Sequence, residues 1–312
     1  MNKKAMVIAI GAYFIWGVLP IYWKQLQHVS SMEVLAHRIF WSLIFLLVIM
    51  LFNRRYYLFL DEMKKTFSCW SSVKNLILTA VLLNINWLTY IWAVNHDFIL
   101  QTSLGYYINP IISVVLGLLI LHERLSVLQW LSFFFVVMGV SFLIVQAGVF
   151  PWVSLILAFS FAFYGLIKKR SQLPAISSLA LEAFVSSVPS VLYVLFLVIQ
   201  GKSVFFDAFG ADQLYLIGAG AATAIPLILF NISAKRLPLF MIGFFQYLAP
   251  TMTLLVAIFI YGEVFSKAHA GAFIMVWIGL LFFSISIFQQ HRVYKKLKNK
   301  DLEQTVINRG PS

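Results

Sequence analysis

Ten apolar runs, each about 20 residues long, follow one another along the chain and leave only short polar connections between them. A run of this length crosses the hydrocarbon core of a bilayer as one α-helix. With 62% apolar and only 11% charged residues, the chain has more apolar surface than a soluble fold of this length could bury. We therefore predict an all-α integral membrane protein with ten transmembrane helices. They lie at about 4–23, 33–52, 73–94, 101–121, 126–145, 151–169, 177–199, 213–234, 240–261 and 267–289.

Basic residues in the connections predict the orientation of these helices. Nineteen Lys and Arg residues fall on the side that holds both termini, whereas only Lys24, Lys202 and Lys267 fall on the other side. Cytoplasmic loops carry such an excess, so we expect both termini in the cytoplasm. The net charge of +12 thus reflects topology, and we expect no nucleic-acid partner. The first run follows Lys3 and Lys4 but lacks a small-residue cleavage site, which favours an uncleaved span.

The chain also repeats itself. A shift of 140 residues, with no gap, places five residues of unlike chemistry on their counterparts: Tyr107 on Tyr247, Pro110 on Pro250, Glu123 on Glu263, Ser126 on Ser266 and Gly139 on Gly279. Each half holds five spans, an odd number, so the second half must enter the membrane from the opposite side. We predict a 5+5 inverted repeat, an architecture typical of transporters. The expected parts are 1–146 and 147–290, followed by a basic cytoplasmic tail at 291–312.

Several motifs, in order and spacing, are similar to those of one family. The matching segments are EVLAHRIFWS (33–42), NWLTYIWAVN (86–95), TSLGYYINP (102–110), LHERLSVLQW (121–130), TAIPLILFNISAKRLPL (223–239) and FFQYLAPT (244–251). They resemble the RarD-type, chloramphenicol-sensitive permeases of the EamA group in the drug/metabolite transporter superfamily. The resemblance covers all but the tail. It implies a ten-helix inverted repeat that moves a small organic solute across a bacterial cytoplasmic membrane.

Polar residues within the second and seventh spans are the first candidates for function. Glu33, His37 and Arg38 lie together near the outer end of the second span. They form either an interfacial ion-pair cluster or the outer mouth of a cavity, in which Arg38 offers planar donors to a carboxylate. Glu182 should lie near the cytoplasmic end of the seventh span, far from Arg38. It is either a carboxylate hydrogen-bonded between helices or a candidate for proton coupling.

The third span carries an amide next to two aromatic residues. Asn86, Trp87 and Tyr90 lie close to one helical face, which favours a pocket for an amphipathic solute. A belt of aromatic residues at the membrane interface is the alternative, and it is the interpretation favoured for Trp92.

Prolines interrupt the fourth, eighth and ninth spans. Pro110, Pro226 and Pro250 each leave a carbonyl without its intrahelical partner, which predicts kinks that face protein or water. These helices line the cavity in our interpretation, and static packing kinks are the alternative. The polar candidates on them are Tyr106, Tyr107, Asn109, Asn231, Gln246 and Tyr247.

Other repeated residues suggest structural roles. Glu123 and Glu263 end helices three residues before the N-cap candidates Ser126 and Ser266. We expect them to stabilise tight connections. Gly139 and Gly279 are predicted close-packing positions.

The absence of other motifs argues against several activities. The chain has no Gly-rich phosphate loop, no HExxH motif and a single cysteine, Cys69, so we expect no enzyme, cofactor or metal site. The expected function is secondary transport of an amino acid, amphipathic metabolite or drug by alternating access, with export as the expected direction. Protons are a candidate coupling ion, and membrane lipids are expected to surround the protein. The alternatives are a flippase for a lipid-linked intermediate, an intramembrane enzyme and a non-transporting membrane subunit.

Overall fold

The computed structural model describes residues 2–96, 98–148, 150–206, 210–262 and 270–290, and this part of the chain is helical with no strand. Ten of its helices are long and apolar enough to cross a membrane, which confirms the predicted all-α membrane protein. They are α1 (Lys3–Trp23), α2 (Ser31–Phe52), α4 (Trp70–Asn95), α5 (Ile99–Ile120), α6 (Val127–Ala147), α7 (Trp152–Arg170), α8 (Ala175–Ile199), α9 (Ala211–Arg236), the successive α10 (Leu239–Gln246) and α11 (Leu248–Phe259), and a last span, Ala270–Gln290.

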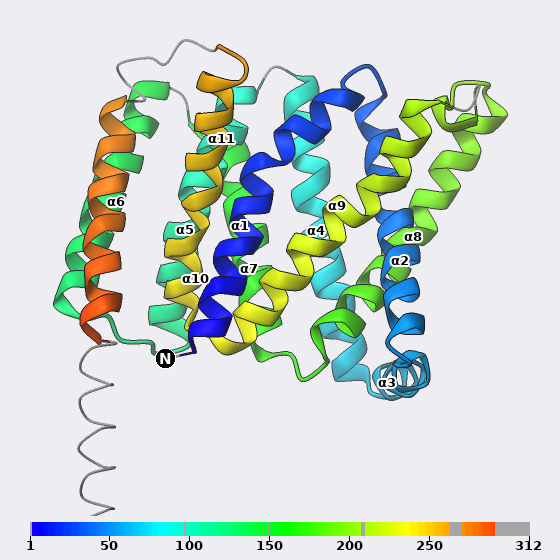
Figure 1. Cartoon of the computed structure of the whole chain (residues 1–312), viewed down its shortest axis with the longest axis horizontal. Helices are drawn as coiled ribbons and strands as arrows, with labels where there is room; N and C mark the ends of the chain where they lie inside the picture. The colour runs from blue at the N-terminus through cyan, green and yellow to red at the C-terminus, as the bar shows by residue number, and fades with distance from the viewer. Residues whose placement is uncertain (1, 97, 149, 207–209, 263–269, 291–312) are drawn as a thin grey trace, which may run out of the picture. The chain divides into compact units, whose positions relative to one another are not determined.

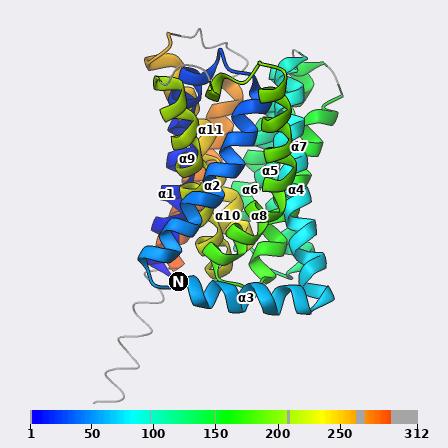
Figure 2. The same cartoon turned by 90° about the vertical axis from the view of Figure 1, so that its right-hand side faces the viewer.

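One further helix, α3 (Tyr56–Ser68), lies crosswise to the neighbouring spans at the end of the bundle where α1 begins (Figure 2). The predicted spans end at 52 and resume at 73, so the sequence pattern predicts only a connection over 53–72. Phe59 and Thr66 of α3 are buried, whereas Tyr57 and Leu58 are exposed. A short helix with one buried and one exposed apolar face is typical of an element at the membrane surface.

Two compact units make up the chain, and each draws on both predicted repeats. The smaller unit pairs α6 with the last span. A Cβ added to Gly139 would lie 2.9 Å from the carbonyl oxygen of Ala272, and one added to Gly279 would lie 2.8 Å from that of Ser132. These two contacts exchange under the shift of 140 residues. Both glycines therefore pack closely against a helix backbone, as their sequence positions predict.

The larger unit contains α1 to α5 and α7 to α11 (Figure 1). Within it α5 packs along α7 and α10, α2 packs along α8 and α9, and α1 packs along α9 and α11. The ninth span is interrupted at Tyr247, where α10 ends and α11 begins, three residues before Pro250. In contrast, α5 continues through Pro110 and α9 continues through Pro226.

Candidate functional site

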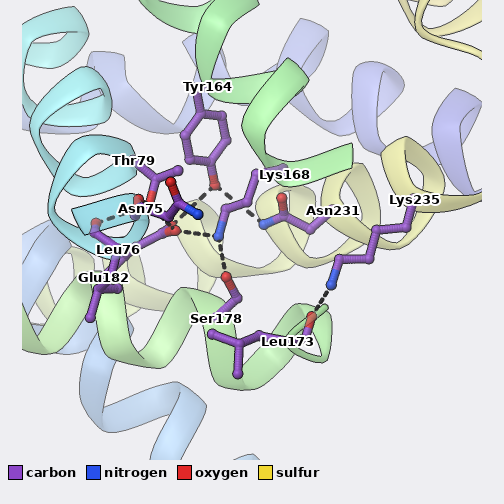
Figure 3. A network of polar contacts seen from close by, with 10 residues as sticks. All are labelled: Asn75, Leu76, Thr79, Tyr164, Lys168, Leu173, Ser178, Glu182, Asn231 and Lys235. Carbon is purple, nitrogen blue, oxygen red and sulfur yellow. Dashed lines mark hydrogen bonds and ion pairs between the residues drawn. The ribbon is translucent and has the colours of Figure 1, made fainter. Parts of the chain in front are cut away.

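A buried ion pair joins the last turn of α7 to α8 (Figure 3). The Lys168 ammonium contacts the Glu182 carboxylate, and the two side chains are only 1% and 3% exposed. Lys168 also donates to the hydroxyl of Ser178 at 2.6 Å, and Thr79 of α4 donates to Glu182 Oε1 at 2.7 Å. Buried charges are tolerated when they are paired and hydrogen-bonded, and both conditions hold here.

Two further helix residues extend this network (Figure 3). The Tyr164 hydroxyl of α7 donates to Glu182 Oε2 at 3.4 Å and accepts from the Asn231 amide of α9 at 3.3 Å. Asn231 is completely buried, and its Oδ1 has no hydrogen-bond partner in the described chain. Side chains of α4 and α7 therefore meet at a carboxylate of α8, and Tyr164 links this group to α9. We call Thr79, Tyr164, Lys168, Glu182 and Asn231 the Glu182 network.

A small cavity of about 30 Å³ borders this network. It follows α2 from Ile39 to Leu46, a length of about 10 Å at the rise of an α-helix. Glu182 lies among its lining residues, and so do Trp87 and Thr223. A volume of this size accommodates a water molecule or two. An organic solute does not fit in a space of this size.

Arg38 of α2 lies next to this cavity, because it contacts the lining residues Thr223 and Trp87. Its Nε donates to the hydroxyl of Thr223 on α9 at 3.0 Å. The guanidinium carbon lies 4.5 Å from the ring centroid of Trp23 and 5.2 Å from that of Trp87. Aromatic faces attract a guanidinium at these distances. Two tryptophans and a threonine thus hold the side chain in a defined position.

Two tyrosines lie beside Arg38. The hydroxyls of Tyr90 and Tyr106 are close enough to interact electrostatically with the guanidinium, and their ring centroids are 6.1 Å apart. Tyr90 is 37% exposed and Tyr106 is 54% exposed, so both rings remain accessible beside the guanidinium. We call Trp23, Arg38, Trp87, Tyr90 and Tyr106 the Arg38 cage.

Glu33 and His37 lie apart from Arg38, so the three residues do not form one cluster. Glu33 is 1% exposed and accepts hydrogen bonds from the Ser203 hydroxyl at 2.7 Å and from the Phe205 backbone at 3.4 Å. His37 Nε2 lies 4.0 Å from Glu33 Oε1, and its ring packs on Phe205 at 4.5 Å. These two residues therefore attach α2 to the connection between α8 and α9.

Other predicted site residues join helices to one another and do not line the cavity. Asn86 donates to the Leu157 carbonyl at 2.9 Å and to the Ser160 hydroxyl at 3.0 Å, which links α4 to α7. Asn109 donates to the Ala158 carbonyl at 3.2 Å, which links α5 to α7. The backbone and side-chain acceptors in these bonds belong to α7, the helix that also supplies Lys168.

The spans that carry Pro110 and Pro250 are joined in the same way. Ser113 of α5 donates to the Gln246 side chain at 3.4 Å. The Tyr247 hydroxyl donates to the Tyr107 carbonyl at 2.8 Å. Gly243 of α10 packs so closely on α5 that an added Cβ would lie 2.8 Å from the Pro110 carbonyl oxygen. The two proline-bearing spans therefore touch at their centres.

The side chain of Glu123 lies at the N-terminus of α10, where it has a structural role. Its carboxylate accepts hydrogen bonds from the backbone of Leu239 at 2.7 Å and of Phe240 at 2.9 Å. Lys169 Nζ lies 3.7 Å from the same carboxylate. A carboxylate at a helix N-terminus satisfies free N–H groups and complements the helix dipole. Its counterpart Glu263, with Ser266 and the tail 291–312, lies outside the described residues.

Comparison with known proteins identifies the family. A sequence profile of the EamA-like transporter family matches residues 3–145. "Uncharacterized transporter YojE" of Bacillus subtilis is 41% identical over 94% of this chain and 98% of its own length. "Protein RarD" of Escherichia coli is 35% identical over 94% of this chain and 98% of its own. The chain belongs to the EamA transporter family, in its RarD group. This EamA protein is therefore a multi-pass membrane transporter.

A solved crystal structure shares the fold of this EamA transporter. The two superpose with a TM-score of 0.70 over 90% of this chain and 98% of the other, at 17% sequence identity. Identity at this level supports the fold alone.

Sequence reasoning missed the central cation of this EamA transporter. Lys168 stands at the head of a Lys-Lys-Arg run, and that run was interpreted as a topology signal. The structure places Lys169 and Arg170 toward the helix end but buries Lys168 against Glu182. A usable signal was present, since Glu182 is an acidic residue in the very next span and a buried carboxylate needs a partner. Trp23, the other missed residue, is the last residue of α1, a position where an aromatic side chain is typical of the membrane interface.

Proposed function

We propose that this EamA protein is a secondary transporter that moves a small organic solute by alternating access. The carrying observation is the contrast between the side chains around Glu182 and those around Arg38. Around Glu182, the ion pair with Lys168 and its hydrogen bonds join α4, α7 and α8. Around Arg38, Tyr90 and Tyr106 remain accessible. This asymmetry is expected of a carrier in an outward-facing state.

The repeat supports the same proposal. Contacts that exchange under the shift of 140 residues, such as Gly139 with Ala272 and Gly279 with Ser132, are expected of two copies related by an approximate two-fold axis. Inverted repeats of this kind provide two similar-energy arrangements, open to opposite sides of the membrane. In our proposal the Glu182 network is the inner gate, and it separates when the transporter opens to the cytoplasm.

Protonation of Glu182 would weaken this gate. A neutral carboxyl group loses its attraction to the Lys168 ammonium, while Thr79 and Tyr164 keep their positions as hydrogen-bonding neighbours. The gate would then open more readily in the protonated state. We therefore propose that the transporter couples solute export from the bacterial cytoplasm to proton entry, with Glu182 as the coupling carboxylate.

Transport by the purified protein in liposomes tests this function. The solutes are a panel of amino acids, aromatic metabolites and chloramphenicol, each measured with and without an imposed pH gradient. We expect saturable flux of at least one compound that accumulates against its gradient when protons flow the other way. Glu182→Gln, which keeps the shape of the side chain, should retain exchange but lose accumulation.

Asp61→Asn is the matched control, because it removes an exposed carboxylate of α3 that pairs with Lys65 at 2.7 Å. It should accumulate solute like the parent protein. Full accumulation by Glu182→Gln would refute the coupling role. Movement of a fluorescent lipid analogue, with no flux of any panel compound, would refute the solute carrier in favour of a flippase.

A further inference from the structure

We propose that the Arg38 cage binds the carboxylate of the transported solute, so that the substrate is an organic anion with an aromatic or apolar body. This inference rests on the proposed transporter function and adds the class of solute. Three observations lead to it: an unpaired guanidinium, the orientation of that group, and the aromatic side chains around it.

Arg38 has no acidic partner among the described residues, because no Asp or Glu of this part of the chain lies within ion-pair distance of its guanidinium. In contrast, the two charged residues of the Glu182 network, Lys168 and Glu182, pair with each other. Glu33, five residues before Arg38 on the same helix, instead accepts hydrogen bonds from Ser203 and Phe205. A cation within a membrane span costs several kcal/mol unless it is compensated. An anionic solute would supply the missing charge.

The orientation of Arg38 suits a carboxylate. Its Nε donates to Thr223 at 3.0 Å, which fixes the plane of the guanidinium. In the described chain no residue accepts a hydrogen bond from the two terminal amino groups. Guanidinium donors arranged as a fork bind a carboxylate through two parallel hydrogen bonds. Stacking on Trp23 and Trp87 holds this fork in place without using its donors.

The surroundings favour an apolar solute body. Trp87 belongs both to the cage and to the lining of the cavity, whose other lining residues include Ile39 and Leu83. Tyr90 and Tyr106 add two accessible rings near Arg38. Small-molecule sites combine such apolar walls with a few polar groups that fix orientation. Widening of the cavity toward Glu182 would then accommodate the body of a solute held at Arg38.

Binding of a matched pair of probes tests the site in the full-length protein. The pair is 3-phenylpropionate and 3-phenylpropionamide, which differ in charge but hardly in shape, and the readout is quenching of tryptophan fluorescence. The carboxylate should bind at least about tenfold more tightly than the amide, as expected when charged hydrogen bonds are lost. Arg38→Gln should bind both probes equally, and Arg38→Lys should retain a smaller preference. Arg55→Gln, which removes an exposed cation at the start of α3, should behave like the parent protein.

The outcomes separate this inference from the proposed function. Equal binding of both probes by the parent protein refutes the carboxylate site, whatever the variants do and whether or not Arg38→Gln folds. Flux of neutral or cationic solutes that Arg38→Gln leaves unchanged also refutes the site, yet leaves the transporter function standing. Carboxylate binding that depends on Arg38 supports the site even where no flux is measured, and in that case only the transport function fails.

Discussion

The hydroxyl of Tyr247 donates a hydrogen bond to the backbone carbonyl of Tyr107 at 2.8 Å, and the two tyrosines are counterparts under the shift of 140 residues. If two repeats are related by a two-fold axis, equivalent residues of the two repeats can contact each other only close to that axis. The contact therefore marks the place where the fourth and ninth spans meet, next to Pro110 and to the interruption before Pro250.

Removing this hydroxyl should weaken the contact between the two kinked spans. We expect Tyr247→Phe to lower the free energy of unfolding by about 0.5–1 kcal/mol, the usual size of a hydrogen bond between transmembrane helices. Thermal unfolding in detergent measures the change. The control is Tyr57→Phe on α3, whose side chain is 83% exposed and should contribute nothing. Equal melting temperatures for all three proteins would contradict the prediction.

The Lys168–Glu182 pair should show strong coupling in a double-mutant cycle. Lys168→Met and Glu182→Leu each leave one buried charge without its partner, so each should destabilise the protein by about 3–5 kcal/mol. The double variant removes both charges and should be more stable than either single variant. Unfolding by denaturant in micelles provides the three differences. Additive effects would show that the two groups do not depend on each other.

Close packing of the smaller unit predicts different results for two glycines of the last span. Gly279→Ala places a methyl group 2.8 Å from the Ser132 carbonyl oxygen, so it should cost about 1–3 kcal/mol. Gly271→Ala is the control, because its methyl group would meet only Phe142 at 3.6 Å, an ordinary contact. Alanine also favours a helix, so this variant should be as stable as the parent protein or slightly more so. Detergent-induced unfolding compares the two, and an equal loss in both would be incompatible with this account.

Cys69 provides a natural probe of orientation. It is the single cysteine of the chain and lies exposed between α3 and α4. Hydrogen bonds from Ser72 and Ser71 lower the pKa of its thiol, so the reactive thiolate forms at lower pH than in an ordinary cysteine. A membrane-impermeant maleimide should label inside-out vesicles but not intact spheroplasts. The labelling rate should rise with pH through this lowered pKa.

Ser72→Ala removes one of the donors to Cys69 and should shift the pH profile of labelling upward. Cys69→Ser should abolish labelling altogether. Labelling of intact spheroplasts would reverse the predicted cytoplasmic position of the α3 end.

The sequence predicted the membrane helices well because bilayer thickness imposes one length and one composition on every span. It was less informative about α3, whose helical period extends over only thirteen residues. Polar residues within spans were recognisable, but their partners were not. Asn86, Asn109 and Tyr247 each bond to a backbone carbonyl, and every residue offers that acceptor, so no sequence pattern marks it.

The candidate site was hard to predict for a similar reason, because the sequence does not show which residues lie side by side in the folded chain. Arg38 and Trp87 could be selected by chemistry and position, but their stacking depends on how α2 crosses α4. Glu182 is recognisable from the sequence as a costly residue within a span, while basic residues near helix ends, such as Lys168, usually indicate topology. The hydrogen bond from Arg38 to Thr223 depends on the crossing of α2 and α9, which the sequence does not show.

The Lys168–Glu182 pair also bears on how the chain enters the membrane during synthesis. The two residues lie on consecutive spans, α7 and α8, which are separated only by residues 171–174. A hairpin formed by these two helices already contains both charges, so it can partition into lipid as a neutral unit before α9 has been made. Separate insertion of either helix would expose an unpaired charge to hydrocarbon at a cost of about 2.5–3.5 kcal/mol. The ion pair therefore favours cotranslational insertion of α7 and α8 together.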